Sequence, residues 1–299
     1  MLLTLNATSL KSLLMPPGRS KKPAMDLLDL PAFTRQTLGL GGLNLSTDLL
    51  AGADRARLEK VRERTDKAAC SCLLLIEPEP QKFGEGGETK AEAAAERTRR
   101  VIEAAHLLGC SAASIHVVAE DDDAVLARVA ARLKPVVERA EKLDLNLLIA
   151  PMKGLTSRPE RVTELLKKVG GFRIGTFPDF QAASAQKDPS AYLHRLTPYA
   201  TVVSASTMHF TSTVKKRGSG EELAHSPYDL NLMVKAIEGV GYDGPLAIDF
   251  RGDGDATTGV LRSKTMLLNA LGEGPIDLDE LEAELAEEDA GAEAPGEQE

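Results

Sequence analysis

The stretch from Leu147 to Pro159, Leu-Leu-Ile-Ala-Pro-Met-Lys-Gly-Leu-Thr-Ser-Arg-Pro, has the pattern of a buried strand followed by its loop. An uninterrupted apolar run reaches Ala150, and Pro151 and Gly154 then interrupt regular structure before a stretch of helical periodicity begins. Strand, loop and helix in this order form the repeating unit of proteins with a parallel sheet.

The same alternation runs through most of the chain. The expected strands are 2–7, 42–46, 71–76, 114–118, 145–149, 173–177, 201–204 and 246–250. The expected helices are 55–69, 90–108, 124–142, 159–169, 189–196, 230–240 and 259–271. No Gly-x-Gly-x-x-Gly run follows any of these strands, so the pattern favours a single (βα)8 TIM barrel of parallel strands over an open nucleotide-binding sheet.

The charge distribution separates the barrel from a tail. The chain has 299 residues, with 36 Lys and Arg against 45 Asp and Glu, but twelve of the acids follow Lys264, the last basic residue. We therefore expect a near-neutral barrel over residues 1–272 and an acidic tail over residues 273–299 that has too few apolar residues to order fully. A near-neutral barrel argues against a nucleic-acid partner.

The cysteines and the first residues indicate a compartment. Cys70, Cys72 and Cys110 do not form a disulfide framework and are expected to be buried thiols in a reducing environment. No export signal is recognisable at the start of the chain, and no segment has the roughly 18 apolar residues of a membrane span. We expect a cytoplasmic protein without a membrane partner.

Polar residues at the strand ends are the first candidates for chemistry, because the active site of a TIM barrel lies at the C-terminal ends of its strands. They are Asn6, Asp48, Glu77, His116, Lys153, Asp179, His209, Asp249 and Arg251.

Two further runs sharpen this set. Residues 241–252, Gly-Tyr-Asp-Gly-Pro-Leu-Ala-Ile-Asp-Phe-Arg-Gly, resemble the strand-eight pattern Gly-Tyr-x-Gly-x-x-x-Ile-Glu-Tyr-x-Gly of the xylose isomerase-like sugar isomerases and epimerases. Residues 177–180, Phe-Pro-Asp-Phe, resemble the Pro-Asp-Phe-Gly-Asn-Phe run that ends strand six there, with Gln181-Ala182 in place of Gly-Asn. The resemblance spans residues 2–271 and implies the same barrel.

The resemblance also implies a divalent metal, Mg or Mn, held by four side chains. Asp179 and Asp249 fall at two of these positions, whereas Ala150 replaces the strand-five Glu and Ser206 falls in a position that other members fill with His. Asp249 itself replaces a Glu and is one methylene shorter. We expect weak metal binding or none, strengthened by Ala150→Glu.

The implied reaction is proton transfer next to the carbonyl of a sugar or sugar phosphate. The candidate catalytic residues are Asp179, Asp249, His116 and Lys153. His116 fits either a structural histidine or an acid/base; Lys153 fits either an exposed loop residue or a cation replacing the metal. Lys215, Lys216 and Arg217 would be available to a phosphate.

Two alternatives stay open at this point. One is a catalytically silent barrel that binds a sugar or regulates a partner, which the loss of ligands at Ala150 and Ser206 favours. The other, the DNA-cutting endonuclease branch of the same barrel, needs more metal-binding histidines and a basic rim than this chain has. The expected partner is a small carbohydrate, and self-association is left open.

Overall fold

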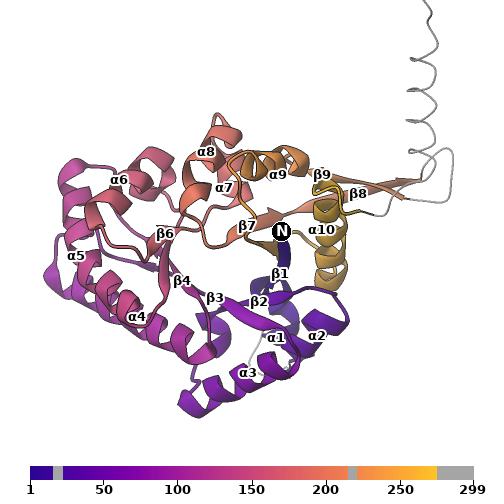
Figure 1. Ribbon diagram of the computed structural model, residues 1–299, viewed down its shortest axis with the longest axis horizontal. Helices are drawn as coiled ribbons and strands as arrows, with labels where there is room; N and C mark the ends of the chain where they lie inside the picture. Colours follow the sequence, from indigo (N-terminus) through magenta and orange to yellow (C-terminus); the bar gives the residue numbers. More distant parts are fainter. Residues whose placement is uncertain (16–22, 215–220, 275–299) are drawn as a thin grey trace, which may run out of the picture.

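The computed structural model describes residues 1–15, 23–214 and 221–274. Eight parallel strands curl into a barrel with helices around the outside (Figure 1). The strands are β1 (Leu2–Asn6), β2 (Gly42–Ser46), β3 (Ser71–Gln81), β4 (Ala112–Val117), β5 (Asn146–Ala150), β6 (Ile174–Thr176), β7 (Val203–Thr207) and β10 (Pro245–Phe250). Neighbouring strands follow the order β6-β5-β4-β3-β2-β1-β10-β7, so the predicted (βα)8 barrel is confirmed.

The barrel closes between β6 and β7, the two ends of this strand order. Two isolated parallel bridges, Thr176 with Ala200 and Asp179 with Ser204, join them. The Ser204 N–H donates to the Pro178 carbonyl at 2.8 Å. We call this junction the seam; among the described residues it has fewer backbone pairs than the ladders between the other strands.

The outer layer consists of one or more helices after each strand. The longer ones lie close to the predicted spans, and a short helix, α7, begins directly after β6. The helices are α1 (Lys11–Leu14), α2 (Leu30–Gln36), α3 (Arg55–Lys67), α4 (Glu88–Leu108), α5 (Asp123–Lys142), α6 (Pro159–Val169), α7 (Phe180–Ser184), α8 (Pro189–Leu196), α9 (Leu230–Glu238) and α10 (Ala256–Ala270).

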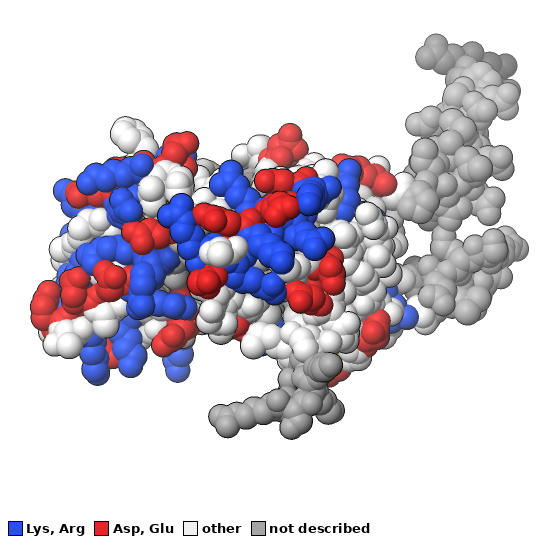
Figure 2. Space-filling model, turned by 90° about the horizontal axis from the view of Figure 1, so that it is seen from below, with Lys and Arg blue, Asp and Glu red and all other residues white. Residues whose placement is uncertain are grey.

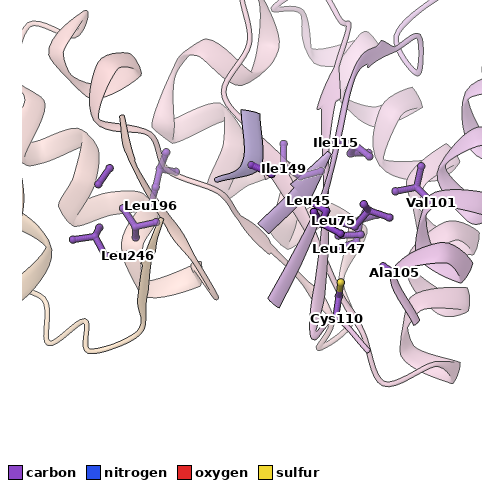
Figure 3. Close-up of a cluster of buried hydrophobic side chains, with 14 of the residues drawn as sticks. Leu45, Leu75, Val101, Ala105, Cys110, Ile115, Leu147, Ile149, Leu196 and Leu246 are labelled. Carbon is purple, nitrogen blue, oxygen red and sulfur yellow. The ribbon is translucent and has the colours of Figure 1, made fainter. Parts of the chain in front are cut away.

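Alternation along the strands divides the apolar side chains between two cores. Leu75 of β3 and Leu147 of β5 belong to the larger core between the strands and the helices, which also contains Val101 of α4 (Figure 3). Leu148 and Ala150, the intervening positions on β5, belong to a smaller core inside the barrel. Ala150 therefore points into the barrel, as the resemblance implied for this position.

Two predicted details around β7 are wrong. The strand covers Val203–Thr207, later than the expected 201–204, so Ser206 lies within it. The segment between the expected strand 201–204 and the expected helix 230–240, for which no strand was expected, forms an antiparallel hairpin, β8 (His209–Val214) with β9 (Glu221–Ser226), which extends away from the barrel past α10 (Figure 1). Lys215, Lys216, Arg217 and all of the acidic tail after residue 274 lie outside the described residues.

The surface carries both signs of charge. Lys and Arg are mixed with Asp and Glu over the face shown in Figure 2. In the described ranges no helix is both long enough and apolar enough to cross a membrane. The three cysteines are free and buried, as predicted.

Candidate active site

A cavity of about 350 Å³ opens at the C-terminal ends of the strands. Ile76, Ala150 and Phe177 are among the apolar residues that line it, and three of the four predicted catalytic residues, His116, Asp179 and Asp249, are among the polar ones. Its size lies within the range of small-molecule sites, which are concave and mostly apolar with a few convergent polar groups.

The guanidinium of Arg251 lies between the two carboxylates of the site. Nη2 donates to Asp179 Oδ2 and to Asp249 Oδ2, both at 2.6 Å, and Nε donates to Asp249 Oδ2 at 2.8 Å. Nη1 donates to Asp179 Oδ1 at 3.3 Å and to Gln181 Oε1 at 2.7 Å. An arginine has five N–H donors, so each has an acceptor on the protein.

The two acids are buried and fixed by further contacts. Asp179 caps α7 by accepting from the Ala182 N–H at 2.9 Å, and it accepts from the Ser204 hydroxyl at 2.8 Å. The Thr8 hydroxyl lies 3.0 Å from Asp249 Oδ1. Burial raises the pKa of Asp249 above its usual value, although Arg251 acts in the opposite direction. Burial acts to lower the pKa of Arg251, but the two carboxylates outweigh it and keep this pKa above normal.

Ser206, at the position of an expected metal ligand, makes structural contacts instead. Its hydroxyl accepts from the Gln181 N–H at 2.8 Å. Its carbonyl accepts from the Tyr228 hydroxyl at 2.7 Å. Ser206 thereby holds Gln181, whose side chain accepts from Arg251. The two residues that differ from the family pattern, Ser206 and Gln181, are therefore in contact.

His116 is held in one tautomer. Its Nδ1 lies 3.3 Å from the Glu77 carbonyl oxygen, and because a carbonyl can only accept, Nδ1 carries the hydrogen. Burial lowers the pKa of His116 below its ordinary value, with the Glu77 carbonyl and Asp179 acting in the opposite direction. The ring is therefore neutral at pH 7, with a lone pair on Nε2.

Lys153 lies apart from these groups. It is exposed and does not line the cavity. The next residue, Gly154, has φ +101°, and a Cβ on it would lie 2.2 Å from the Ala119 carbonyl oxygen. This close approach fixes the loop after β5 against the loop after β4. Lys153 thus lies on a loop of fixed position at the edge of the cavity, outside its lining.

The other strand-end residues divide between the cavity and the surroundings. Asn6 lines the cavity. Glu77 faces away from it and pairs with Arg97, Asp48 pairs with Lys11, and His209 is exposed on β8. Strand-end position alone nominated Arg251; its two-residue spacing from Asp249, which puts both on one face of the chain, was the signal that could have singled it out.

The donor set does not fit a hard divalent ion. Such an ion needs about six oxygen or nitrogen ligands. Over residues 1–15, 23–214 and 221–274, no group of three or more His, Cys, Asp and Glu side chains is placed to hold a metal. The two available carboxylates are both engaged by Arg251.

The fold is shared with sugar-converting enzymes. Among solved structures, an L-ribulose 3-epimerase matches with a TM-score of 0.71 at 14% identity, covering 99% of both chains. A 3-keto-D-glucoside 4-epimerase from E. coli matches at 0.68 and 12%, covering 90% of this chain and 99% of the other. A xylose isomerase-like TIM barrel protein from Mycobacterium smegmatis, solved in complex with magnesium, matches at 0.65 and 14%, covering 91% and 97%.

The sequence itself identifies the family. A search of curated proteins finds no significant match. The family model for the xylose isomerase-like TIM barrel matches residues 36–271, which include β2 to β10, His116, Asp179 and Asp249. The chain therefore belongs to the xylose isomerase-like TIM barrel family.

Proposed function

We propose that the cavity binds a small carbohydrate and that the protein is an isomerase or epimerase that moves a proton next to the carbonyl of that sugar. The observation that carries the proposal is the convergence of His116, Asp179 and Asp249 on one cavity at the C-terminal ends of the strands. The sugar epimerases among the structural neighbours support the substrate class.

His116 is the base in this proposal. Its Nε2 lone pair takes the proton from the carbon beside the carbonyl, and the electron pair of the broken C–H bond moves onto the carbonyl oxygen. In an isomerase, the protonated His116 returns its proton to the neighbouring carbon while a proton passes from the hydroxyl oxygen to the former carbonyl oxygen. In an epimerase, a proton from solvent adds to the opposite face of the same carbon, and His116 releases its proton to solvent. The neutral form of the ring, which burial favours by lowering the pKa of His116, is the form that can accept this proton.

The charge of the site favours an unphosphorylated sugar. When ionised, Asp179 and Asp249 together outweigh the single positive charge of Arg251, and a phosphate dianion would meet a site with net negative charge.

The remaining candidates have distinct roles. Asp249, with its raised pKa, is suited to hold or exchange a proton with a sugar hydroxyl. Asp179 is fully engaged and orients Arg251. Lys153 would contact only the part of a ligand that extends past the rim, which makes it a specificity residue.

A specific observation also favours a barrel that binds a sugar without converting it. Every N–H of Arg251 is engaged within the protein, so no free donor of this residue is aimed at a developing oxyanion. Such a barrel would keep the affinity for a carbohydrate and lose the proton transfer.

Solvent exchange separates the two functions. The purified protein is incubated in D2O with a panel of neutral ketoses and aldoses, and NMR follows deuterium entering the carbon beside the carbonyl. We expect exchange with at least one sugar, a loss of about a hundredfold or more in His116→Gln, and sugar binding retained in that variant by calorimetry.

Two outcomes would count against the enzyme. Sugar binding without exchange in the parent protein would establish the silent barrel. Exchange that survives in His116→Gln would move the base to another residue. Phosphorylated sugars serve as the comparison, and tighter binding of these than of neutral sugars would contradict the proposed substrate class.

A further inference from the structure

We propose that the guanidinium of Arg251 is the resident cation of this site, built in where a divalent ion would otherwise lie between Asp179 and Asp249, so that the site works without a metal. The inference shares its cavity with the proposed function but does not depend on catalysis, because its test measures metal binding and stability.

The first support is the completeness of the contacts. Both carboxylates approach Arg251 Nη2 at 2.6 Å, and the carboxylate side chains are 7% exposed. A metal ion could bind both acids only after the guanidinium had left, which would break charge-assisted hydrogen bonds that are strong in such surroundings. The arginine therefore competes directly with a metal for the same oxygens.

The second support is the agreement between separate departures from the family pattern. Gln181 replaces a glycine and provides an acceptor for Arg251 Nη1 at 2.7 Å. Ser206, in the position of a metal-binding histidine, holds the Gln181 N–H at 2.8 Å. A site that had merely lost its metal would have no reason to gain these linked contacts. The replacements instead form one network around the guanidinium.

The third support is that one expected metal-ligand position, Ala150, has no side chain able to bind a metal. Ala150 points into the cavity and offers no ligand. Restoring a carboxylate here by Ala150→Glu, which the sequence alone suggests as a repair, would first give Arg251 a third anionic neighbour. Metal binding should return only when the arginine is removed as well.

A resident guanidinium behaves differently from a metal ion. It cannot be removed by a chelator, and it stays charged at every pH at which the protein is folded. Its five donors are already engaged, so a ligand oxygen would feel its charge without entering its hydrogen-bond shell. It also keeps the two carboxylates from repelling each other.

The experiment titrates Mn²⁺ and Mg²⁺ into the full-length protein, followed by calorimetry and by the electron paramagnetic resonance signal of free Mn²⁺. The parent is compared with Ala150→Glu, Arg251→Met and the double variant. Arg262→Met is the matched control, because this arginine lines a separate cavity beside the hairpin and has no contact with the two acids.

We expect the parent, Ala150→Glu and Arg262→Met not to bind Mn²⁺ below millimolar concentrations, and chelator not to change the melting temperature of the parent. The double variant should bind Mn²⁺ about tenfold tighter than the parent or better, and a further Asp249→Asn change should abolish that gain. Arg251→Met alone should be less thermostable than Arg262→Met.

Micromolar Mn²⁺ binding by the parent that is lost in Asp249→Asn would overturn the proposal, as would a folded double variant that binds no tighter than the parent. If the Met variants do not fold, the same series is made with Arg251→Lys. The titration of the parent still tests the proposal, because it needs no variant at Arg251. If the parent binds no metal and also shows no exchange with any sugar, the proposed function is refuted, whereas the inference about Arg251 is supported.

Discussion

Two carboxylate–arginine clusters lie on opposite sides of the barrel wall. Glu77 of β3 is 1% exposed and pairs with Arg97 of α4, Nη2 to Oε2 at 2.6 Å, on the helix side of the barrel wall. Asp179 and Asp249 share Arg251 on the cavity side. Ile76, the residue before Glu77, lines the cavity, so alternation along the strand turns Glu77 outward.

The difference teaches how to separate a structural ion pair from a site. Glu77 has one cation for one carboxylate; its Oε1 also accepts from the Glu79 N–H at 3.0 Å, and Arg97 reaches the Thr47 hydroxyl. The one positive charge balances the one negative charge. The cavity cluster has two carboxylates for one cation and lines the cavity beside His116, so a ligand can contact it. Charge imbalance together with access, rather than burial, marks the site.

The largest expected effect is on the structural pair. Arg97→Met leaves the Glu77 carboxylate buried without its cation and should lower the free energy of unfolding by about 3 kcal/mol in urea titrations. Arg99→Met, which removes exposed pairs to Glu92 and Glu96 on the same helix, should cost less than about 0.5 kcal/mol. Sugar affinity should be unchanged in both. Equal costs for the two variants would mean that Glu77 is not a structural anchor.

A smaller loss of stability, coupled to a loss of binding, is expected on the cavity side. Ser206→Ala removes the acceptor of the Gln181 N–H and should destabilise the protein by about 1–2 kcal/mol, while weakening sugar binding because Gln181 and Arg251 shift. Thr98→Ala on α4, whose hydroxyl donates to the Ala94 carbonyl, removes a buried hydroxyl on the other side. It should cost a similar amount and leave binding intact, measured by urea unfolding and calorimetry. Equal losses of sugar affinity in Ser206→Ala and Thr98→Ala would contradict the proposed difference between the cavity side and the helix side.

Acid should loosen the cavity side before the Glu77 side. His225 accepts from the Met208 N–H through Nε2 at 3.0 Å and donates through Nδ1 to the Tyr228 carbonyl at 2.8 Å, so protonation would break the first bond. Burial lowers the pKa of His225, and the nearby His209 lowers it further, against the Tyr228 carbonyl. The stability contributed by the neutral ring is full above the unfolded pKa of about 6.5 and is lost as the pH falls through the lower folded value.

Unfolding free energies measured between pH 7.5 and pH 5 should therefore decline with acid, by less than about 1 kcal/mol from this residue. The decline should be shallower in His225→Gln and unchanged in Arg99→Met, which removes only exposed ion pairs. His116, whose pKa is also lowered by burial, should retain part of the slope. An identical slope in His225→Gln would show that His225 does not titrate as its contacts require.

The smallest effect is expected at Lys153. This residue is exposed and stands outside the cavity, so Lys153→Ala should change the unfolding free energy by less than about 0.5 kcal/mol and monosaccharide affinity by no more than about twofold. Calorimetry and the exchange assay check both values. A large loss of exchange would restore Lys153 to the catalytic group that the sequence suggested and would extend the site beyond the acid pair.

The sequence predicted the fold more fully than the site. Apolar runs located every barrel strand, because buried parallel strands are continuously apolar. The exception is β7, where the apolar run ends at Val203 but pairing with β10 carries Ser-Ala-Ser-Thr into the strand through Thr207. Hydrogen bonds to a neighbour distant in sequence leave no local signal. The hairpin β8–β9 was missed because it extends away from the barrel and has no place in the strand–helix alternation.

At the site, the sequence predicted which residues lie near the cavity but not which side chains contact each other. Strand-end position and the family resemblance put Asp179 and Asp249 at the barrel mouth, the resemblance added Ala150, and all three line the cavity. That the Arg251 guanidinium reaches Asp179 depends on closure of the barrel, which brings β10 beside β7 and the end of β6. No periodicity in a sequence encodes that distance.

The seam gives this site a second property. Asp179 contributes both its backbone bridge to Ser204 and its side chain to Arg251, so the same residue belongs to the seam and to the lining of the cavity. A sugar that contacts groups on both sides of the seam would stabilise the closed barrel. Occupancy and closure are then thermodynamically linked, and amides of β6 and β7 should exchange with solvent more slowly as sugar concentration rises, by a larger factor than amides of β3 and β4.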